Sequence, residues 1–205
     1  MSQYFSIHPD NPQPRLARRA AEMLAAGRLI VYPTDSCYAL GCRLGDKAAL
    51  ERMRRLRQVD DKHAFTLMCA DLGDIATYAQ VDNTVYRLLK TLTPGPFTFI
   101  LPASRELPRI TRNRRGEVGI RVPDSRIAHA LLAEHGEPIV SSTLLLPGDE
   151  APLTDSWEIR ERLEHEVDLV VDGGFCGWEM TTVLDLTGPE VQLRRAGRGD
   201  ASAVL

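Results

Sequence analysis

The 205-residue sequence has few aromatic residues, few cysteines and no long apolar segment. Its longest apolar runs, such as 29–32, are far shorter than the ~18 residues that a membrane-spanning helix needs. Residues 1–5 contain neither a basic stretch nor an apolar core, so no secretory signal is expected. Lys and Arg number 25 against 28 Asp and Glu, which argues against a general nucleic-acid-binding protein. We therefore expect a soluble cytoplasmic protein with no membrane partner.

The sequence offers little for a metal site. Cys37 and Cys42 have no second cysteine pair and no histidine set nearby, so zinc binding is not expected. Disulfides are rare in proteins that are not exported. We expect the four cysteines, which include Cys69 and Cys176, to be reduced and half-buried, packing as small hydrophobic side chains.

Three common enzyme motifs are also missing. The sequence has no G-x-x-x-x-G-K-[ST] loop, no G-x-G-x-x-G after its first predicted strand and no G-x-S-x-G elbow. These absences exclude a P-loop nucleotidase, give no support to a dinucleotide fold and exclude a typical esterase.

Strand and helix patterns alternate along the chain, and no linker divides it, so we predict one domain, residues 1–205. The alternation indicates a two- or three-layer α/β fold, and the strand-rich C-terminal third indicates a partly antiparallel sheet. Strands are expected at 28–32, 38–42, 65–69, 97–101, 118–122, 139–142, 169–171, 182–186 and 191–194. Helices are expected from an Asn11 cap with Pro12 at the first position to Gly27, after Asp46, at 71–78 and 83–92, from Asp124 to Gly136, and after Asp155.

Positive charge is unevenly distributed. Residues 105–121 contain six arginines, residues 51–62 contain five basic residues, and Arg194, Arg195 and Arg198 lie near the end of the chain. Such runs are usually solvated surfaces. The alternative is a fold that gathers the three basic segments around one anionic ligand.

Polar residues stand at the ends of predicted strands, where open α/β sheets place their ligands. Thr34 and Asp35 follow one strand, and Ser141 and Thr143 end another. An ordinary turn is the simpler interpretation of residues 33–36. Arg121 lies inside an apolar strand, and a buried arginine needs an anionic partner, so it must contact an acid or face a ligand cavity.

Six short motifs follow one another along the chain, beginning with V-Y-P-T-D-S-C-Y-A-L-G-C at 31–42. The others are P-G-P-F-T at 94–98, R-V-P at 121–123, S-S-T at 141–143, T-T-V-L-D at 181–185 and R-A-G at 195–197. In order and spacing they resemble the motifs of the YrdC/YciO family of threonylcarbamoyl-AMP synthases. F-T-L-M-C at 65–69 and S-T-L-L-L-P-G at 142–148 are more similar to the YciO branch than to the TsaC branch.

The resemblance implies a YrdC-like fold: a twisted, open, mixed parallel and antiparallel sheet with flanking helices and a concave basic cavity. It implies that ATP, with Mg²⁺ as its substrate complex, reacts with L-threonine and bicarbonate to give L-threonylcarbamoyl-adenylate and pyrophosphate. The product would feed t6A modification of tRNA position 37 through a separate transferase partner. Family members are also associated with double-stranded RNA, so tRNA or double-stranded RNA is a further implied partner.

The resemblance also implies a set of site residues. Arg55 and Arg57 would be catalytic and hold phosphates or a carboxylate, while Thr34 and Asp35 would orient the threonine. Because the family's matching arginine lies in the ligand site, we predict that Arg121 faces the cavity. The other substrate- or nucleotide-binding residues would be Lys62, His63, Thr98, Ser141, Thr143, Thr181 and Arg195. No residue is predicted to ligate a metal.

The sequence departs from the active branch at three positions. Arg55 replaces a lysine, and these two cations are not equivalent. Leu145 replaces an asparagine and Pro147 a serine, and one lost polar contact costs ~1–3 kcal/mol. These departures are consistent with a weak or specialised threonylcarbamoyl-AMP synthase. The alternatives are a nucleotide- or double-stranded-RNA-binding module of the YciO branch, or a ligase or hydrolase acting on a related carbamoyl-adenylate.

Overall fold

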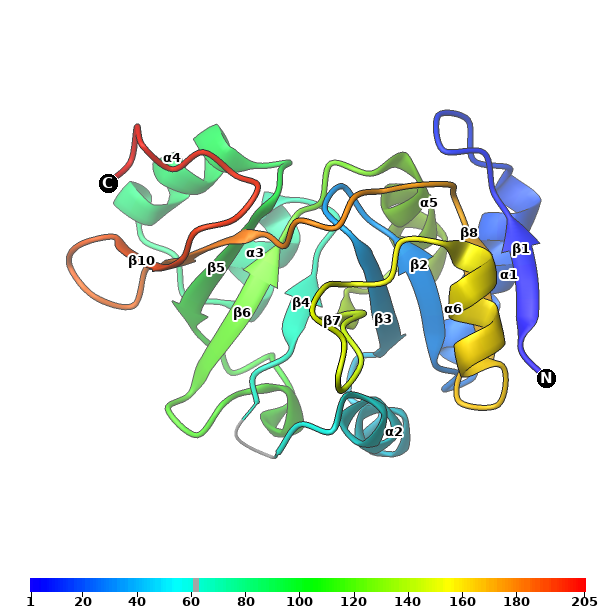
Figure 1. Cartoon of the computed structure of the whole chain (residues 1–205). Coiled ribbons are helices and arrows are strands. Elements are labelled where there is room, and N and C mark those ends of the chain that lie inside the picture. The colour runs from blue at the N-terminus through cyan, green and yellow to red at the C-terminus, as the bar shows by residue number, and fades with distance from the viewer. Residues whose placement is uncertain (61–62) are drawn as a thin grey trace.

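The strands of the computed structural model, which describes residues 1–60 and 63–205, form a ten-stranded mixed sheet (Figure 1). Their order across the sheet is β1-β8-β2-β3-β7-β4-β6-β5-β9-β10. Their bounds are β1 (Gln3–Ser6), β2 (Ile30–Pro33), β3 (Tyr38–Arg43), β4 (Thr66–Met68), β5 (Phe97–Pro102), β6 (Glu117–Arg121), β7 (Ile139–Thr143), β8 (Leu169–Asp172), β9 (Thr182–Asp185) and β10 (Gln192–Arg195).

The strand pairings confirm a mixed sheet. Four pairs are parallel, namely β1–β8, β8–β2, β4–β6 and β5–β9. The antiparallel pairs are not confined to the C-terminal third, because β2–β3, β3–β7, β7–β4 and β6–β5 run antiparallel as well as β9–β10. Short turns are the reason in part, since the four residues 34–37 join β2 to β3 and permit only a hairpin.

The helices are mostly where the sequence pattern places them, and their caps explain their starts. Asp46, Asp71, Asp82 and Asp155 each accept backbone N–H groups of the following turn. The bounds are α1 (Pro14–Ala25), α2 (Lys47–Arg57), α3 (Leu72–Tyr78), α4 (Asn83–Leu92), α5 (Arg126–His135), α6 (Ser156–Leu163) and a 3₁₀ turn, η1 (Arg109–Thr111).

Two predicted helix starts are wrong. The first helix begins at Pro14 rather than Pro12, because both prolines fit a first helical position and the chain uses the second. Asn11 instead donates its backbone N–H to the His8 ring. The cap of α5 is Ser125, not Asp124, since the Ser125 hydroxyl accepts the Ala128 N–H.

The two faces of the sheet carry different cores. On one face, Val31, Val140 and Ile120 pack in a cluster with buried residues of α2, α3, α4 and α6. On the other, Ile30 and Ile139 pack against α1 and α5. Alternation along each strand produces this division. The second cluster reaches from β1 to Met68 of β4 and includes no residue of β6, β5, β9 or β10.

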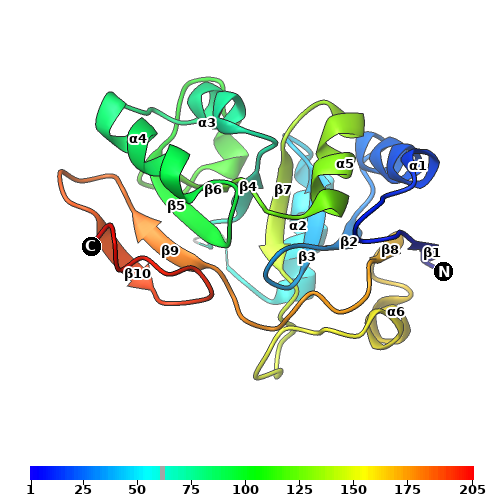
Figure 2. The same cartoon turned by 90° about the horizontal axis from the view of Figure 1, so that it is seen from above.

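Sheet twist explains why the four helices α1, α5, α3 and α4 lie on one side of the molecule in Figure 2 although they cover opposite faces. Neighbouring strands rotate by ~20–25°, so ten strands accumulate about half a turn. The face that α1 and α5 cover at one end of the sheet therefore turns away from them at the other end.

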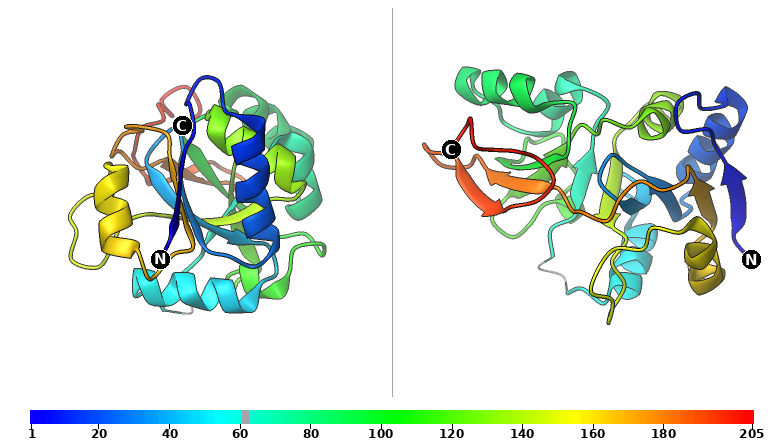
Figure 3. Two further views of the ribbon diagram at one scale, coloured as in Figure 1. Left: turned by 90° about the vertical axis from the view of Figure 1, so that its right-hand side faces the viewer. Right: turned by 45° about the horizontal axis from the view of Figure 1, so that its top comes forward.

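One segment links the two ends of the sheet. Residues 173–181, here called the strap, lead from β8, second in the order, to β9, ninth (Figures 1 and 3). The strap packs on the β2–β3 turn: Tyr38 Oη donates to the Gly174 carbonyl at 2.8 Å, and a Cβ on Gly177 would lie 2.8 Å from the Ser36 carbonyl oxygen. Gly177 also has φ +102°, so only glycine fits this crossing.

Candidate active site

A cavity of about 240 Å³ opens on the same sheet face as α1 and α5, over the part that these helices leave uncovered. Its floor is formed by alternate residues of neighbouring strands. Glu117, Gly119 and Arg121 of β6 lie in it, and Thr66 of β4 is in register with both Gly119 and Ser141. The lining residues are Thr34, Ser36, Cys37, Ala39, Arg57, His63, Ala64, Thr66, Met68, Thr98, Ile100, Asn113, Glu117, Gly119, Arg121, Ser141, Ser142, Thr143, Met180, Thr181, Val183 and Arg195.

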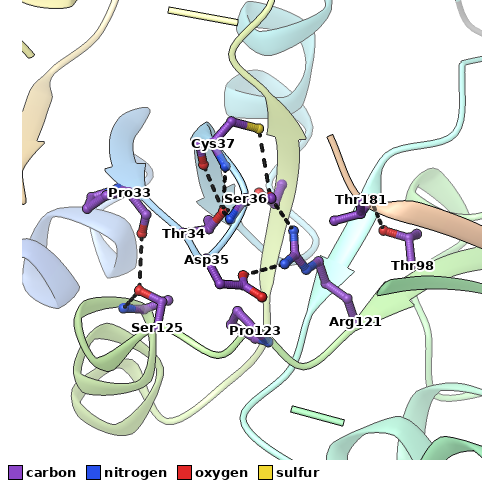
Figure 4. Close-up of polar contacts among 12 residues, drawn as sticks. Pro33, Thr34, Asp35, Ser36, Cys37, Thr98, Arg121, Pro123, Ser125 and Thr181 are labelled. Carbon is purple, nitrogen blue, oxygen red and sulfur yellow. Dashed lines mark hydrogen bonds and ion pairs between the residues drawn. The ribbon is translucent and has the colours of Figure 1, made fainter. Parts of the chain in front are cut away.

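At one end of the cavity, Arg121 forms a buried ion pair with Asp35 through Nη2 and Oδ1 (Figure 4). Its Nη1 donates to Ser36 Oγ at 3.2 Å. The arginine therefore both contacts an acid and lines the cavity, so both alternatives that the sequence left open are present in the structure. Asp35 Oδ2 and Arg121 Nε are buried without a hydrogen-bond partner in the described chain. A buried polar atom without a hydrogen bond lowers the stability of the fold unless a ligand or a water molecule supplies the missing partner.

The turn 34–37 holds Asp35 and Ser36 in place. Thr34 Oγ1 donates to the Cys37 carbonyl at 2.7 Å and accepts the Ser36 N–H at 3.2 Å. The segment is thus a hydrogen-bonded turn and also a wall of the cavity, which unites the two interpretations of this motif.

The hydroxyl groups of the cavity are tied into its walls. Thr98 Oγ1 and Thr181 Oγ1 are 2.8 Å apart (Figure 4). Arg195 donates to the Thr181 carbonyl and hydroxyl. Ser141 Oγ donates to the Leu40 carbonyl at 3.0 Å and accepts from Tyr32 Oη at 2.9 Å. Burial raises the pKa of Tyr32 to about 12, so this phenol is a fixed neutral donor.

The last turn of α2 contributes Arg57 but not Arg55. Two residues along a helix are ~200° apart, so the two side chains point in different directions. Arg57 lines the cavity, and its Nε is buried without a hydrogen-bond partner in the described chain. Arg55 lines a separate surface cavity with Arg52 and Arg162. The structure therefore does not bring the two predicted catalytic arginines together.

His63 lies beside Arg57, and burial followed by the charges of Arg57 and Arg54 lowers its pKa. Burial likewise lowers the pKa of Arg57 and of Arg195. The remaining predicted site residues that line the cavity are Thr34, His63, Thr98, Ser141, Thr143, Thr181 and Arg195. Lys62 lies outside the described residues.

Each of the three basic segments contributes one arginine to the cavity, namely Arg57, Arg121 and Arg195. The three basic segments thus meet at one cavity, each through a single arginine. The other arginines of 105–115 are outside the lining, and Arg112 is occupied by the carbonyls of Arg105 and Leu107.

Sequence reasoning missed several cavity residues. Asn113 and Glu117 come from the β6 hairpin, where polar residues are common, so the sequence carries no signal for them. Met180 reaches the cavity only because the strap crosses the sheet. Ser36 belongs to the motif at 31–42. Its hydroxyl group, two residues after that of Thr34, is the sequence feature from which its place in the site could be predicted.

The cysteines are free, and Cys37, Cys42 and Cys69 are fully rather than half buried; Cys42 and Cys69 belong to the core cluster that contains Val31 and Ile120. Burial raises the pKa of Cys42 and of Cys176 to about 12. In residues 1–60 and 63–205 no three His, Cys, Asp or Glu side chains come together as a metal site. Within the same ranges, no helix has the length and apolarity to cross a bilayer.

Known proteins share this architecture. The family model Sua5_yciO_yrdC, described as "Telomere recombination", matches residues 22–197. YciO of Escherichia coli strain K12 is 51% identical over 206 residues, 100% of both chains, and its crystal structure superposes with a TM-score of 0.96. A threonylcarbamoyl-AMP synthase of Chromobacterium violaceum is 33% identical over 144 residues, 70% of this chain and 75% of the synthase.

Sua5 of P. abyssi, solved in complex with L-threonine, has a TM-score of 0.88 at 25% identity, covering 96% of this chain and 58% of Sua5. Sua5 therefore shares the fold of this chain. From the match over most of its length and from these relatives, the chain belongs to the Sua5/YciO/YrdC family.

Proposed function

We propose that the protein is a threonylcarbamoyl-AMP synthase that binds L-threonine and MgATP in the cavity described above. The observation that carries the proposal is the buried Arg121–Asp35 pair. A guanidinium beside a carboxylate, each with an unpartnered atom, complements the carboxylate and the amino group of an amino acid. The relatives named for threonylcarbamoyl-AMP synthesis and solved with L-threonine support this ligand.

The reaction needs no side-chain nucleophile. The amino nitrogen of threonine adds to bicarbonate with loss of water and forms N-carboxythreonine. A carboxylate oxygen of that carbamate attacks the α-phosphorus of ATP, the bond from the α-phosphorus to the bridging oxygen breaks, and pyrophosphate leaves. Catalysis then depends on positioning and on positive charge near the phosphate oxygens.

The cavity offers groups for each part of that reaction. Arg121 would hold the carboxylate of the amino acid, with Thr34 and Ser36 close to its side chain. Asp35, which is not among the lining residues, would orient Arg121 through the ion pair. Arg57 and Arg195 are partly buried cations that would face the phosphates. Thr98, Ser141, Thr143 and Thr181 supply hydroxyl groups around the nucleotide.

The experiment is incubation with ATP, L-threonine and bicarbonate, followed by measurement of pyrophosphate and of the adenylate. Formation of both, dependent on threonine and lost in Arg57→Ala, is expected. Omission of bicarbonate with removal of dissolved CO₂ must stop the reaction. Pyrophosphate release that ignores threonine would refute the synthase assignment. The product would pass to a t6A transferase acting on tRNA.

One observation favours a second function, nucleotide binding without efficient turnover. Leu145 and Pro147 bring no amide or hydroxyl to the cavity, and Pro147 lines the other surface cavity with Arg55. A protein of this kind would bind ATP and threonine in calorimetry but release pyrophosphate no faster than the Arg57→Ala variant.

Double-stranded RNA remains a partner that is predicted from the sequence alone. A cavity of about 240 Å³ is too small for a duplex, so contacts would come from the exposed arginines 105, 109 and 115 outside it. Binding would then weaken steeply with salt, because each neutralised phosphate releases counterions. Equal binding at low and moderate salt, or none at low salt, would exclude it.

A further inference from the structure

A phenol from the apolar half of the sheet reaches the cavity. Tyr32 of β2 is fully buried in the cluster that α1 and α5 cover, and its Oη donates to Ser141 Oγ on β7 at 2.9 Å. Strand β3 lies between β2 and β7. The ring crosses β3 at Gly41, where a Cβ would lie 2.7 Å from Tyr32 Cε1. Gly41 therefore leaves the room through which Tyr32 reaches a residue of the cavity wall.

The hydroxyl group of Ser141 has little hydrogen-bonding capacity left. A serine hydroxyl has one proton to donate and two lone pairs to accept with. The proton of Ser141 goes to the Leu40 carbonyl at 3.0 Å, and one lone pair accepts the proton of Tyr32. Ser141 lines the cavity, so one lone pair remains for a ligand. It can accept a hydrogen bond there, but it can donate none while it keeps its bond to the Leu40 carbonyl.

The hydroxyl groups on β5 and next to β9 differ in this respect. Thr98 Oγ1 and Thr181 Oγ1 share one hydrogen bond, and Arg195 donates to Thr181 Oγ1. Two hydroxyl groups hold two protons, and only one of these lies between the pair, so the other can be donated to a ligand. Phosphate oxygens accept hydrogen bonds, so they suit the threonine pair and do not suit Ser141.

The Tyr32–Ser141 pair lies near the Arg121 end of the cavity. Burial is the main cause that raises the pKa of Tyr32 to about 12, and smaller contributions come from the charges of Arg121, which lowers it, and Asp35, which raises it. These two charges are therefore close to the phenol. The free lone pair of Ser141 is thus near the arginine that would hold the carboxylate of the amino acid.

We propose that Tyr32 is a positioning residue, which holds Ser141 as the acceptor for an N–H or O–H group of the bound substrate and so disfavours phosphate oxygens at this side of the cavity. The inference rests on the proposed function. In that function the available donors are the amino and hydroxyl groups of threonine and the hydroxyl groups of the ribose. The position near Arg121 favours threonine as the source.

The test is calorimetric binding of three separate probes to the full chain: L-threonine, a non-hydrolysable ATP analogue with Mg²⁺, and inorganic pyrophosphate. The variants are Tyr32→Phe, Ser141→Ala and the control Tyr4→Phe, each first shown to unfold cooperatively in urea. Tyr4 Oη lies 2.8 Å from Ser156 Oγ on the edge strand β1, so the control breaks the same kind of hydroxyl pair away from the cavity.

Tyr32→Phe and Ser141→Ala should each weaken binding of the donor-bearing ligand at least about fivefold, which corresponds to ~1 kcal/mol. Pyrophosphate binding by both variants, and binding of all three probes by Tyr4→Phe, should stay within about twofold of wild type. Weaker binding of threonine alone identifies the amino acid as the donor, and weaker binding of the analogue alone identifies the ribose.

Three results would overturn the proposal. Equal weakening of all three probes would show a merely structural role or a bond from Ser141 to phosphate. Unchanged binding of threonine and the analogue in both variants would show that the ligand does not use Ser141. Weakening by Ser141→Ala alone would remove the role of Tyr32. A wild type that binds neither threonine nor the analogue refutes the proposed function together with this inference.

Discussion

The same sheet face serves two purposes in its two halves. Over β8, β2, β3 and β7 it carries Ile30, Ile139 and Leu169, which are fully buried under α1 and α5. Over β4, β6, β5 and β9 the equivalent positions hold polar residues such as Thr66, Arg121 and Thr98, and no helix covers them. The difference shows that the cavity occupies a part of the core face that α1 and α5 do not cover. Apart from the buried Arg121–Asp35 pair, substitutions in the apolar half should therefore lower stability, and those in the polar half should lower ligand binding.

Breaking the buried ion pair should have the largest effect. Arg121→Ala leaves Asp35 buried and unpaired, so we expect a loss of ~3–5 kcal/mol in the free energy of unfolding. The double variant Arg121→Met with Asp35→Asn removes both charges and should regain most of that stability, but not threonine binding. Urea unfolding and calorimetry measure both quantities. A double variant as unstable as the single one would contradict this account.

Truncation in the apolar half should cost nearly as much stability but no binding. Ile139→Ala should lose ~2–5 kcal/mol, because a buried side chain disappears and a cavity remains. Thr66→Ala, on the same face over β4, should change stability by no more than ~0.5 kcal/mol. Equal losses from the two substitutions would remove the distinction between the halves.

The two arginines of the last turn of α2 form a matched pair for nucleotide binding. Arg57→Ala should weaken ATP binding at least tenfold, or ~1.4 kcal/mol, because Arg57 lines the cavity. Arg55→Ala should leave the affinity within about twofold, the spread expected of a surface substitution. A stronger effect of Arg55 would show that the second surface cavity takes part in nucleotide binding.

The smallest expected effect is the pH dependence of the free energy of unfolding that His135 produces in the apolar half. His135, at the end of α5, is buried, and burial lowers its pKa despite the opposing charge of Glu137. The unfolded chain then binds the proton more readily than the folded chain, so stability present above pH ~6.5 is lost as the pH falls. His135→Asn should flatten this decline in urea unfolding between pH 7.5 and 5. His165→Asn, at an exposed histidine, should not.

The sequence is informative where a pattern is local. Arg121 could be assigned because an arginine inside an apolar strand needs a partner. β1 was not predicted, because residues 3–6 lack a clear alternation and pair with β8 at the far end of the chain. The structure does not place Arg55 beside Arg57 in the cavity, because side chains two residues apart on a helix point in directions that differ by ~200°. The short sequence motif does not show this. Glu117 escaped notice because an acid at the start of a strand is ordinary.

The strap also has a consequence for how the molecule is assembled. β8 pairs with β1 and β2, whereas β9 pairs with β5, so the nine residues between them join strands that six other strands separate in the sheet. Thr181 and Arg195 belong to the part of the chain made last, and such long-range pairing is slow to form. The cavity is therefore expected to be the final piece of the native state to form during folding and the first to open. In native-state hydrogen exchange, the amides of β9 should exchange before those of β3 and β7.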